Sequence, residues 1–78
     1  MQLYPNPNTG SFTIILPGGY GKAVLEVMDM LGKVVVKRNI NGVEVDINLN
    51  EEALAAGSYF VKVTAGERVY RKKVSIVR

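Results

Sequence analysis

The chain has 78 residues and a formal net charge of +3, so it is long enough for one small hydrophobic core and not for two. It contains no cysteine and no histidine, which excludes disulfides, thiolate metal sites and the side chains most used as general bases and nucleophiles at neutral pH. The apolar content of 47% is that of a globular domain, and no run of 18 apolar residues predicts a transmembrane helix.

The chain opens on a segment that two prolines stiffen. Pro5 and Pro7 fix φ and lack a backbone N–H, so we expect an extended segment that does not join a sheet centrally. Gly10 then permits a sharp entry into the first full strand. Met1 leads into this segment without the charged and apolar regions of a signal peptide. Either the intact protein is cytosolic, or the chain is an excised C-terminal piece to which Met1 was added, and we favour the excised piece.

Alternation of apolar and polar residues dominates the rest of the chain. Glycines and prolines separate runs of four to ten residues, a length typical of strands rather than helices. The runs that predict strands are Ser11–Leu16, Ala23–Met28, Lys33–Ile40, Val43–Leu49, Ser58–Thr64 and Arg68–Val77. About seven short strands must form two packed sheets or a barrel. We predict a single all-β domain over residues 1–78, an immunoglobulin-like antiparallel β-sandwich.

Three connections that contain glycine predict hairpins between these strands. Asp29–Gly32 joins two apolar strands, with Asp29 capping its own turn and Gly32 at positive φ. The Asn-Gly pair at 41–42 is the strongest two-residue hairpin signal in the chain, and residues 65–67 link the last two strands.

One segment, Asn50–Gly57, has helical signals. Asn50 is a good N-cap, the two glutamates that follow it suit a first turn, and Gly57 is a natural residue to end a helix. We expect one or two helical turns here, with Leu54 packing them onto the core.

No group of residues in the sequence predicts catalysis. The acidic side chains at Glu26, Asp29 and residues 51–52 would need a cleft to act as a catalytic pair, which a sandwich of this size rarely has. We interpret them as a turn cap and solvated side chains. No serine or threonine has a histidine to activate it, and Gly18–Gly21 lacks the Lys-Ser/Thr and the helix of a phosphate loop. We therefore expect no enzyme, no cofactor and no metal site.

The last eleven residues are strongly basic. They contain Arg68, Arg71, Lys72, Lys73 and Arg78, with Tyr70 among them. This composition could bind nucleic acid, but alternation divides the charges between the two faces of a strand. We favour an edge strand that its charges protect from aggregation. A third interpretation is a recognition strand for a protein partner, through charge complementarity or strand addition.

Four motifs, in this order, resemble a known family. They are Leu3–Gly10 followed by the strand Ser11–Ile14, then Val27–Lys33, then Leu54–Tyr59, and finally Lys72–Arg78. A Pro-x-Pro-x-x-Gly opening, an Asp-x-x-Gly-Lys hairpin, a Leu-x-x-Gly-x-Tyr segment and a basic-apolar final strand are similar to the type A C-terminal sorting domain of the bacterial type IX secretion system. Each motif alone is common, and together they span essentially the whole chain.

The resemblance implies a C-terminal secretion signal. Such a domain directs its cargo from the periplasm across the outer membrane through the type IX translocon, an outer-membrane shuttle protein recognises it, and a surface sortase removes it. The cargo then lies at the cell surface or outside the cell. The partners are proteins, with no nucleic acid and no membrane span. The alternative function is an immunoglobulin-like adhesive or structural module that stays in the mature protein.

The resemblance also assigns roles to individual residues. Those that it implies for partner recognition are Gly57, Tyr59, Lys73, Val74, Ile76, Val77 and Arg78. Those that match the pattern and that we interpret as structural are Pro5, Pro7, Gly10, Asp29, Gly32 and Lys33. A long final strand and a stiff opening segment are exchangeable elements, so a strand-swapped dimer of the isolated domain is a further expectation.

Overall fold

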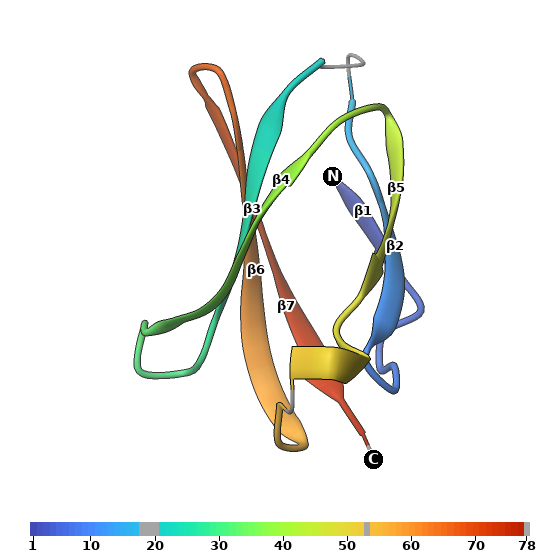
Figure 1. Ribbon diagram of the computed structural model, residues 1–78, viewed down its shortest axis with the longest axis vertical. Coiled ribbons are helices and arrows are strands. Elements are labelled where there is room, and N and C mark those ends of the chain that lie inside the picture. The colour runs from blue at the N-terminus through green and yellow to red at the C-terminus, as the bar shows by residue number, and fades with distance from the viewer. Residues whose placement is uncertain (18–20, 53, 78) are drawn as a thin grey trace.

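The computed structural model describes residues 1–17, 21–52 and 54–77, and these residues form a sandwich of two antiparallel sheets. One sheet has three strands in the order β1-β2-β5, and the other has four in the order β4-β3-β6-β7 (Figure 1). The strands are β1 (Gln2–Tyr4), β2 (Ser11–Ile15), β3 (Ala23–Met28), β4 (Val34–Ile40), β5 (Glu44–Asn48), β6 (Gly57–Ala65) and β7 (Arg68–Ile76); a 3₁₀ turn, η1 (Asn50–Glu52), follows β5.

The connections between strands are those of an immunoglobulin-like sandwich, as predicted. β1 pairs with β2 in the three-stranded sheet, while β3 pairs with β4 and β6 with β7 in the four-stranded sheet. The links from β2 to β3, from β4 to β5 and from β5 to β6 cross from one sheet to the other. These crossings bring the apolar faces of the two sheets against each other.

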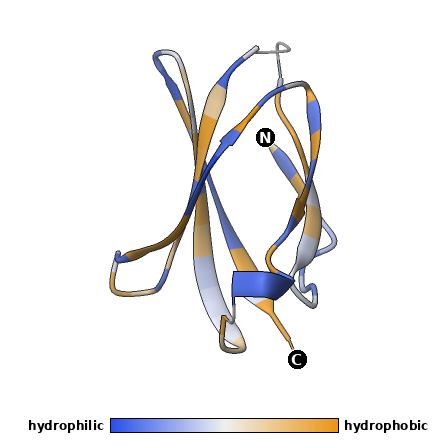
Figure 2. Ribbon diagram, viewed as in Figure 1, coloured by the Kyte–Doolittle hydropathy of each residue, from blue (hydrophilic) through white to orange (hydrophobic). Residues whose placement is uncertain are grey.

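The core lies between the sheets and is filled by the inward side of each strand. β3 alternates strictly between buried and half-buried residues, and β6 does so from its second residue, as the period-two pattern predicted. Figure 2 shows the same alternation as apolar and polar bands along the ribbons. The buried apolar residues are Phe12, Ile14, Leu16, Ala23, Leu25, Val27, Val36, Ile40, Ile47, Leu49, Tyr59, Val61, Val63, Ala65, Val74 and Ile76.

The predicted hairpin at Asn41-Gly42 is wrong. β4 and β5 belong to different sheets, and the segment between them carries the chain across the sandwich (Figure 1). Gly42 has the positive φ, 113°, that the Asn-Gly signal predicts. The carbonyl of Val43, however, accepts a hydrogen bond from Leu16 N at 2.8 Å instead of closing a β4–β5 hairpin. A local turn signal reports backbone conformation and not whether the flanking strands pair.

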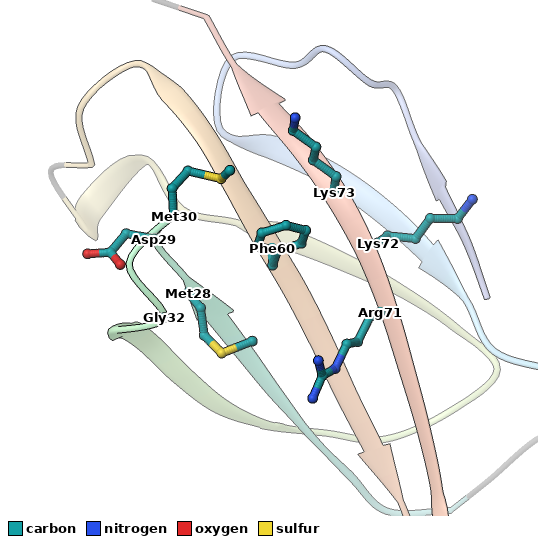
Figure 3. A pocket seen from close by; sticks show the side chains of 8 residues that line it. All are labelled: Met28, Asp29, Met30, Gly32, Phe60, Arg71, Lys72 and Lys73. Atoms are coloured by element: carbon teal, nitrogen blue, oxygen red, sulfur yellow. The ribbon is translucent and has the colours of Figure 1, made fainter.

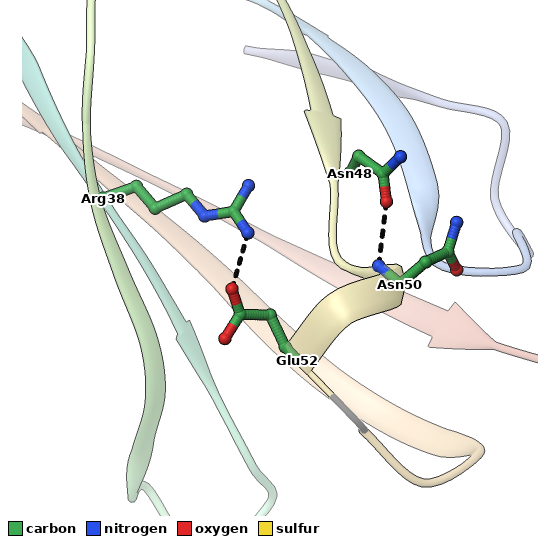
Figure 4. A network of polar contacts seen from close by, with 4 residues as sticks. All are labelled: Arg38, Asn48, Asn50 and Glu52. Atoms are coloured by element: carbon green, nitrogen blue, oxygen red, sulfur yellow. Dashed lines mark hydrogen bonds and ion pairs between the residues drawn. The ribbon is translucent and has the colours of Figure 1, made fainter.

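The predicted helical segment contains one 3₁₀ turn, within the one or two turns expected, but its caps differ from those predicted. Asn50 is not the capping residue; its N–H donates to Asn48 Oδ1 at 2.8 Å (Figure 4). Glu52 N donates to Leu49 O at 3.0 Å. Gly57 begins β6 and does not end the turn. Because Asn48 comes earlier and has the same capping chemistry, it takes the role assigned to Asn50. Leu54 packs half-buried against the core, as predicted.

An ion pair links η1 to the other sheet. Arg38 on β4 lies 2.7 Å from Glu52 Oε1, through its Nη2 atom (Figure 4). Both side chains are about one third exposed, at 33% and 37%, so we assign the pair a small contribution of about 0–1 kcal/mol.

Candidate recognition surface

The opening segment of the chain covers half of the outer edge of β7. β7 is the last strand of its sheet, with β6 on one side only. Asn8 N donates to Ser75 O at 3.0 Å and Val77 N donates to Asn8 O at 2.8 Å, which makes a parallel bridge between Asn8 and Ile76. The Asn6 side chain continues this pairing: its Nδ2 donates to Lys73 O and its Oδ1 accepts from Ser75 N, both at 3.0 Å.

Asn8 fixes the shape of the segment that covers β7. Its side chain is only 4% exposed, yet both ends of the amide have partners. Nδ2 donates to Pro5 O at 3.1 Å, and Oδ1 accepts from the buried Gly10 N at 2.9 Å. Gly10 itself has φ of 111°, the conformation that the sharp entry into β2 was predicted to need. The peptide bonds before Pro5 and Pro7 are both cis.

The other half of the β7 edge is not covered by this segment. The backbone groups of Lys73, Ser75 and Val77 face Asn6 and Asn8. Because the backbone groups of every second residue in a strand face the same edge, those of Val69 and Arg71 lie on this edge too. Among the described residues, no backbone hydrogen bond from outside the sheet reaches these two positions. Charged residues in this half, such as Arg68, suit the predicted edge strand.

The structure brings the described residues among those implied for recognition together where β6 begins and β7 ends, and three of them are buried. The side chains of Tyr59, Val74 and Ile76 are buried in the core, and the Tyr59 hydroxyl donates to Ala55 O at 2.6 Å. Gly57 lies opposite Ile76 across the β6–β7 ladder. At the surface are Lys73, which is exposed, and Val77, which is 50% exposed. Arg78 lies outside the described residues.

The turn between β3 and β4 has the structure that the sequence predicted. Asp29 Oδ1 accepts hydrogen bonds from Leu31 N at 2.9 Å and Lys33 N at 3.0 Å. Gly32 N donates to Asp29 O at 3.0 Å, and Gly32 has φ of 87°. The carboxylate therefore holds the turn in one conformation. Within it Met30 is 54% exposed and Leu31 is 94% exposed.

A shallow hollow of about 300 Å³ lies on the outer face of the four-stranded sheet beside this turn (Figure 3). Its apolar part comes from Met28, Met30 and Phe60, and its basic part from Arg71 and Lys73 on β7. The ladder aligns these strands, since Met28 lies opposite Phe60 and Phe60 lies opposite Lys73. Asp29, Gly32 and Lys72 complete the lining.

Sequence reasoning missed this hollow because it sorted the strands only into inward and outward positions. Met28 and Phe60 occupy outward positions, where polar residues are expected, and both are half-buried. The signal was present: a large apolar residue at an outward position of each of two strands is unusual on a solvated face. The sequence pattern does not tell which strands are neighbours in a sheet.

The charges on this outer face are unevenly matched. Glu26 on β3 has Lys37 directly opposite on β4 and Lys62 directly opposite on β6. Arg71 lies opposite Lys62, and Lys73 lies opposite Phe60, so neither has an acidic cross-strand neighbour. Among the described residues, neither side chain forms a hydrogen bond or an ion pair. This part of the face therefore presents two unneutralised cations.

The described part of the chain contains neither a cluster of metal-ligating side chains nor a helix that could span a membrane. No group of three or more acidic side chains there is arranged to hold a metal ion. Over those same residues, no helix has both the length and the apolar character needed to cross a bilayer.

By its fold and by the surfaces just described, the molecule is a small immunoglobulin-like β-sandwich module. Residues 2–77 match the family model of the secretion system C-terminal sorting domain, and the chain belongs to this family. No curated protein matches the chain.

The family match confirms the resemblance carried by the four motifs. The domain is a C-terminal sorting signal for type IX secretion, and its family is one of sorting signals rather than of enzymes. Membership implies that the domain interacts with the secretion system and that its destination is the cell surface or the extracellular space.

Proposed function

We propose that residues 1–78 are a single sorting domain at the C-terminal end of a larger secreted cargo protein. The cargo reaches the periplasm and crosses the outer membrane through the type IX translocon. An outer-membrane shuttle protein recognises the domain, and a surface sortase removes it. The observation that carries the proposal is the family match over residues 2–77, a span that contains the first three sequence motifs and all of the fourth except Arg78.

The recognition residues divide into two groups under this proposal. The exposed Lys73 and Val77, with Arg78, contact the partner directly. The residues that shape this end of the β6–β7 ladder are the buried Tyr59, Val74 and Ile76, together with Gly57, which is exposed and lies opposite Ile76 in the ladder. This division follows from burial, because a partner cannot reach a core side chain without opening the sandwich.

The export test is a fusion of an inert reporter between a Sec signal peptide and residues 1–78, expressed in a bacterium with a type IX system. We expect the reporter at the cell surface, where added protease cleaves it in intact cells. The controls are the same fusion in a strain without the translocon and a fusion without residues 1–78. A folded fusion that stays in the periplasm of the competent strain contradicts the proposal.

Variants separate the two groups of recognition residues. Tyr59→Phe removes only the hydroxyl that donates to Ala55 O, so we expect a loss of about 0.5–1.5 kcal/mol in unfolding free energy and unchanged export. Lys73→Ala combined with Val77→Ser leaves the core intact, so we expect unchanged thermal unfolding and severalfold less reporter at the surface. The reverse pattern would show that the division by burial is wrong.

Two measurements test the remaining parts of the proposal. Mass spectrometry of the surface cargo should find no peptide from residues 1–78; finding such peptides would favour the retained adhesive module.

Size-exclusion chromatography with light scattering tests the strand-swapped dimer of the isolated domain, which should appear as a second, heavier species at high protein concentration.

A further inference from the structure

We propose that the hollow beside the Asp29–Gly32 turn is a docking site for an acidic segment of a partner protein, which places one apolar side chain between Met28 and Phe60 and its carboxylates against Arg71 and Lys73. This deepens the proposed function and rests on it, because it specifies which surface the secretion machinery contacts and what chemistry it brings.

The geometry of the hollow suits an anchored side chain. Figure 3 shows Met28 and Met30 directed from the β3 side toward Phe60, which stands on β6 in the middle. Arg71 and Lys73 border it from β7, while Lys72 points away to the other side of the strand. Methionine side chains adapt to varied partners, and aromatic and arginine residues are those that most often dominate binding energy.

The positive charge of the hollow indicates that an acidic segment binds there. Glu26 already has two lysines opposite it, whereas Arg71 and Lys73 have no acidic cross-strand neighbour. Asp29 also lines the hollow, but its Oδ1 accepts hydrogen bonds from Leu31 N and Lys33 N. A partner segment with carboxylates would supply the missing anions, and an apolar residue between them would fill the space over Phe60.

The turn beside the hollow is rigid and exposed at the same time. Asp29 fixes its conformation, yet Leu31 is 94% exposed and Met30 is 54% exposed. Figure 1 shows that this turn projects from the four-stranded sheet on the side away from β1, β2 and β5. Apolar side chains that a rigid turn holds in place, and that do not pack on the core of the domain, are suited to packing on a partner.

Binding can be tested with nuclear magnetic resonance and a synthetic probe. The probe is the peptide acetyl-Ser-Asp-Phe-Glu-Asp-Leu-Gly-Ser-amide, with one control in which lysines replace its acidic residues and another in which serines replace Phe and Leu. We expect the amide signals of Met28, Leu31, Phe60, Arg71 and Lys73 to shift with the probe, less at high salt, and not with either control. Absence of shifts at millimolar probe, or equal shifts with the lysine control, overturns the proposal.

Charge-reversed variants show whether the hollow is the place where the probe binds. Arg71→Glu with Lys73→Glu should weaken probe binding by roughly tenfold, the size expected for loss of a binding hot spot. The matched control, Lys22→Glu with Arg68→Glu, makes the same change in net charge outside the hollow and should bind as the unchanged protein does. A duplex oligonucleotide or anionic vesicles that bind the hollow more tightly than the probe would assign it to another class of partner and overturn the proposal.

The same variants in the reporter fusion separate this inference from the proposed function. If the unchanged domain is exported and only the Arg71–Lys73 variant fails, with its thermal unfolding preserved, both proposals hold. If both variants are exported like the unchanged domain, the docking site is wrong and the sorting function stands. If the unchanged domain is not exported, the sorting function itself fails.

Discussion

Asparagine side chains take the place of backbone groups at several points in this sandwich. Asn6 pairs with β7 as a strand residue would, through Lys73 O and Ser75 N. Asn48 caps the 3₁₀ turn, and Asn8 binds Pro5 O and Gly10 N within one loop. The amide of asparagine carries a donor and an acceptor together, as a peptide group does, and neither a carboxylate nor a methyl group offers both.

Loss of the Asn8 side chain should destabilise the domain. Asn8→Ala leaves Gly10 N buried without its acceptor and Pro5 O without its donor, so we expect a loss of about 1–3 kcal/mol in the free energy of unfolding. The measurement is urea denaturation. Asn39→Ala is the matched control, because Asn39 is exposed on β4, and its unfolding free energy should change by less than about 0.5 kcal/mol. Equal midpoints for the two variants would contradict the role of Asn8.

At the scale of single elements, the β3–β4 turn depends on the backbone conformation of one glycine. A Cβ on Gly32 would meet no atom within 4 Å, but the φ of 87° is one that residues with a side chain rarely adopt. Gly32→Ala should therefore cost about 1 kcal/mol through backbone strain alone. Gly21 also has open space, and its φ lies outside this range, so Gly21→Ala should be neutral or slightly stabilising. The measurement is the thermal unfolding midpoint of both variants. Because both glycines have open space around them, the difference between the two midpoints reports the cost of the positive φ at Gly32.

The strands and the buried side of each were predictable from the sequence because period two reports which face a residue occupies. Phe12 and Ile14 on β2, and Val61 and Val63 on β6, lie in the core as their alternation indicated. The Asp29 cap was predictable for a similar reason, since every group in that turn lies within a few residues.

Features that depend on which segments meet in space were not predictable in the same way. The Asn41-Gly42 signal was local and correct in φ, but the strands on either side of it join different sheets. The hydrogen bonds between the opening segment and β7 join residues near opposite ends of the sequence, such as Asn6 and Ser75. The hollow needs the neighbours β3, β6 and β7, an order that the alternation of each strand does not contain.

At the scale of the whole molecule, the opening residues protect both sheets. β1 pairs along β2 in one sheet, and Asn6 and Asn8 cover the end of β7 in the other. Removal of residues 1–10 should expose strand edges in both sheets at once, and exposed edges pair with other chains.

The truncated chain should therefore lose its cooperative thermal transition and form large species in size-exclusion chromatography with light scattering. The control is Asn6→Ala, which breaks only the two side-chain bonds to β7 and should stay a folded monomer with a modestly lower midpoint. A truncated chain that is monomeric and melts like the intact one would show that the opening segment does not stabilise the sandwich.

The pairing of Asn8 with Ser75 and Val77 also has a consequence for when the domain can close. The first residues of the domain have to wait for the last strand before their hydrogen bonds can form, so the sandwich closes only after translation has reached β7. In the proposed arrangement, in which a cargo precedes residues 1–78, a cargo whose synthesis stops early would carry the opening segment and no closed domain. In that arrangement, only a cargo that has been synthesised to its last strand would carry a closed sorting domain.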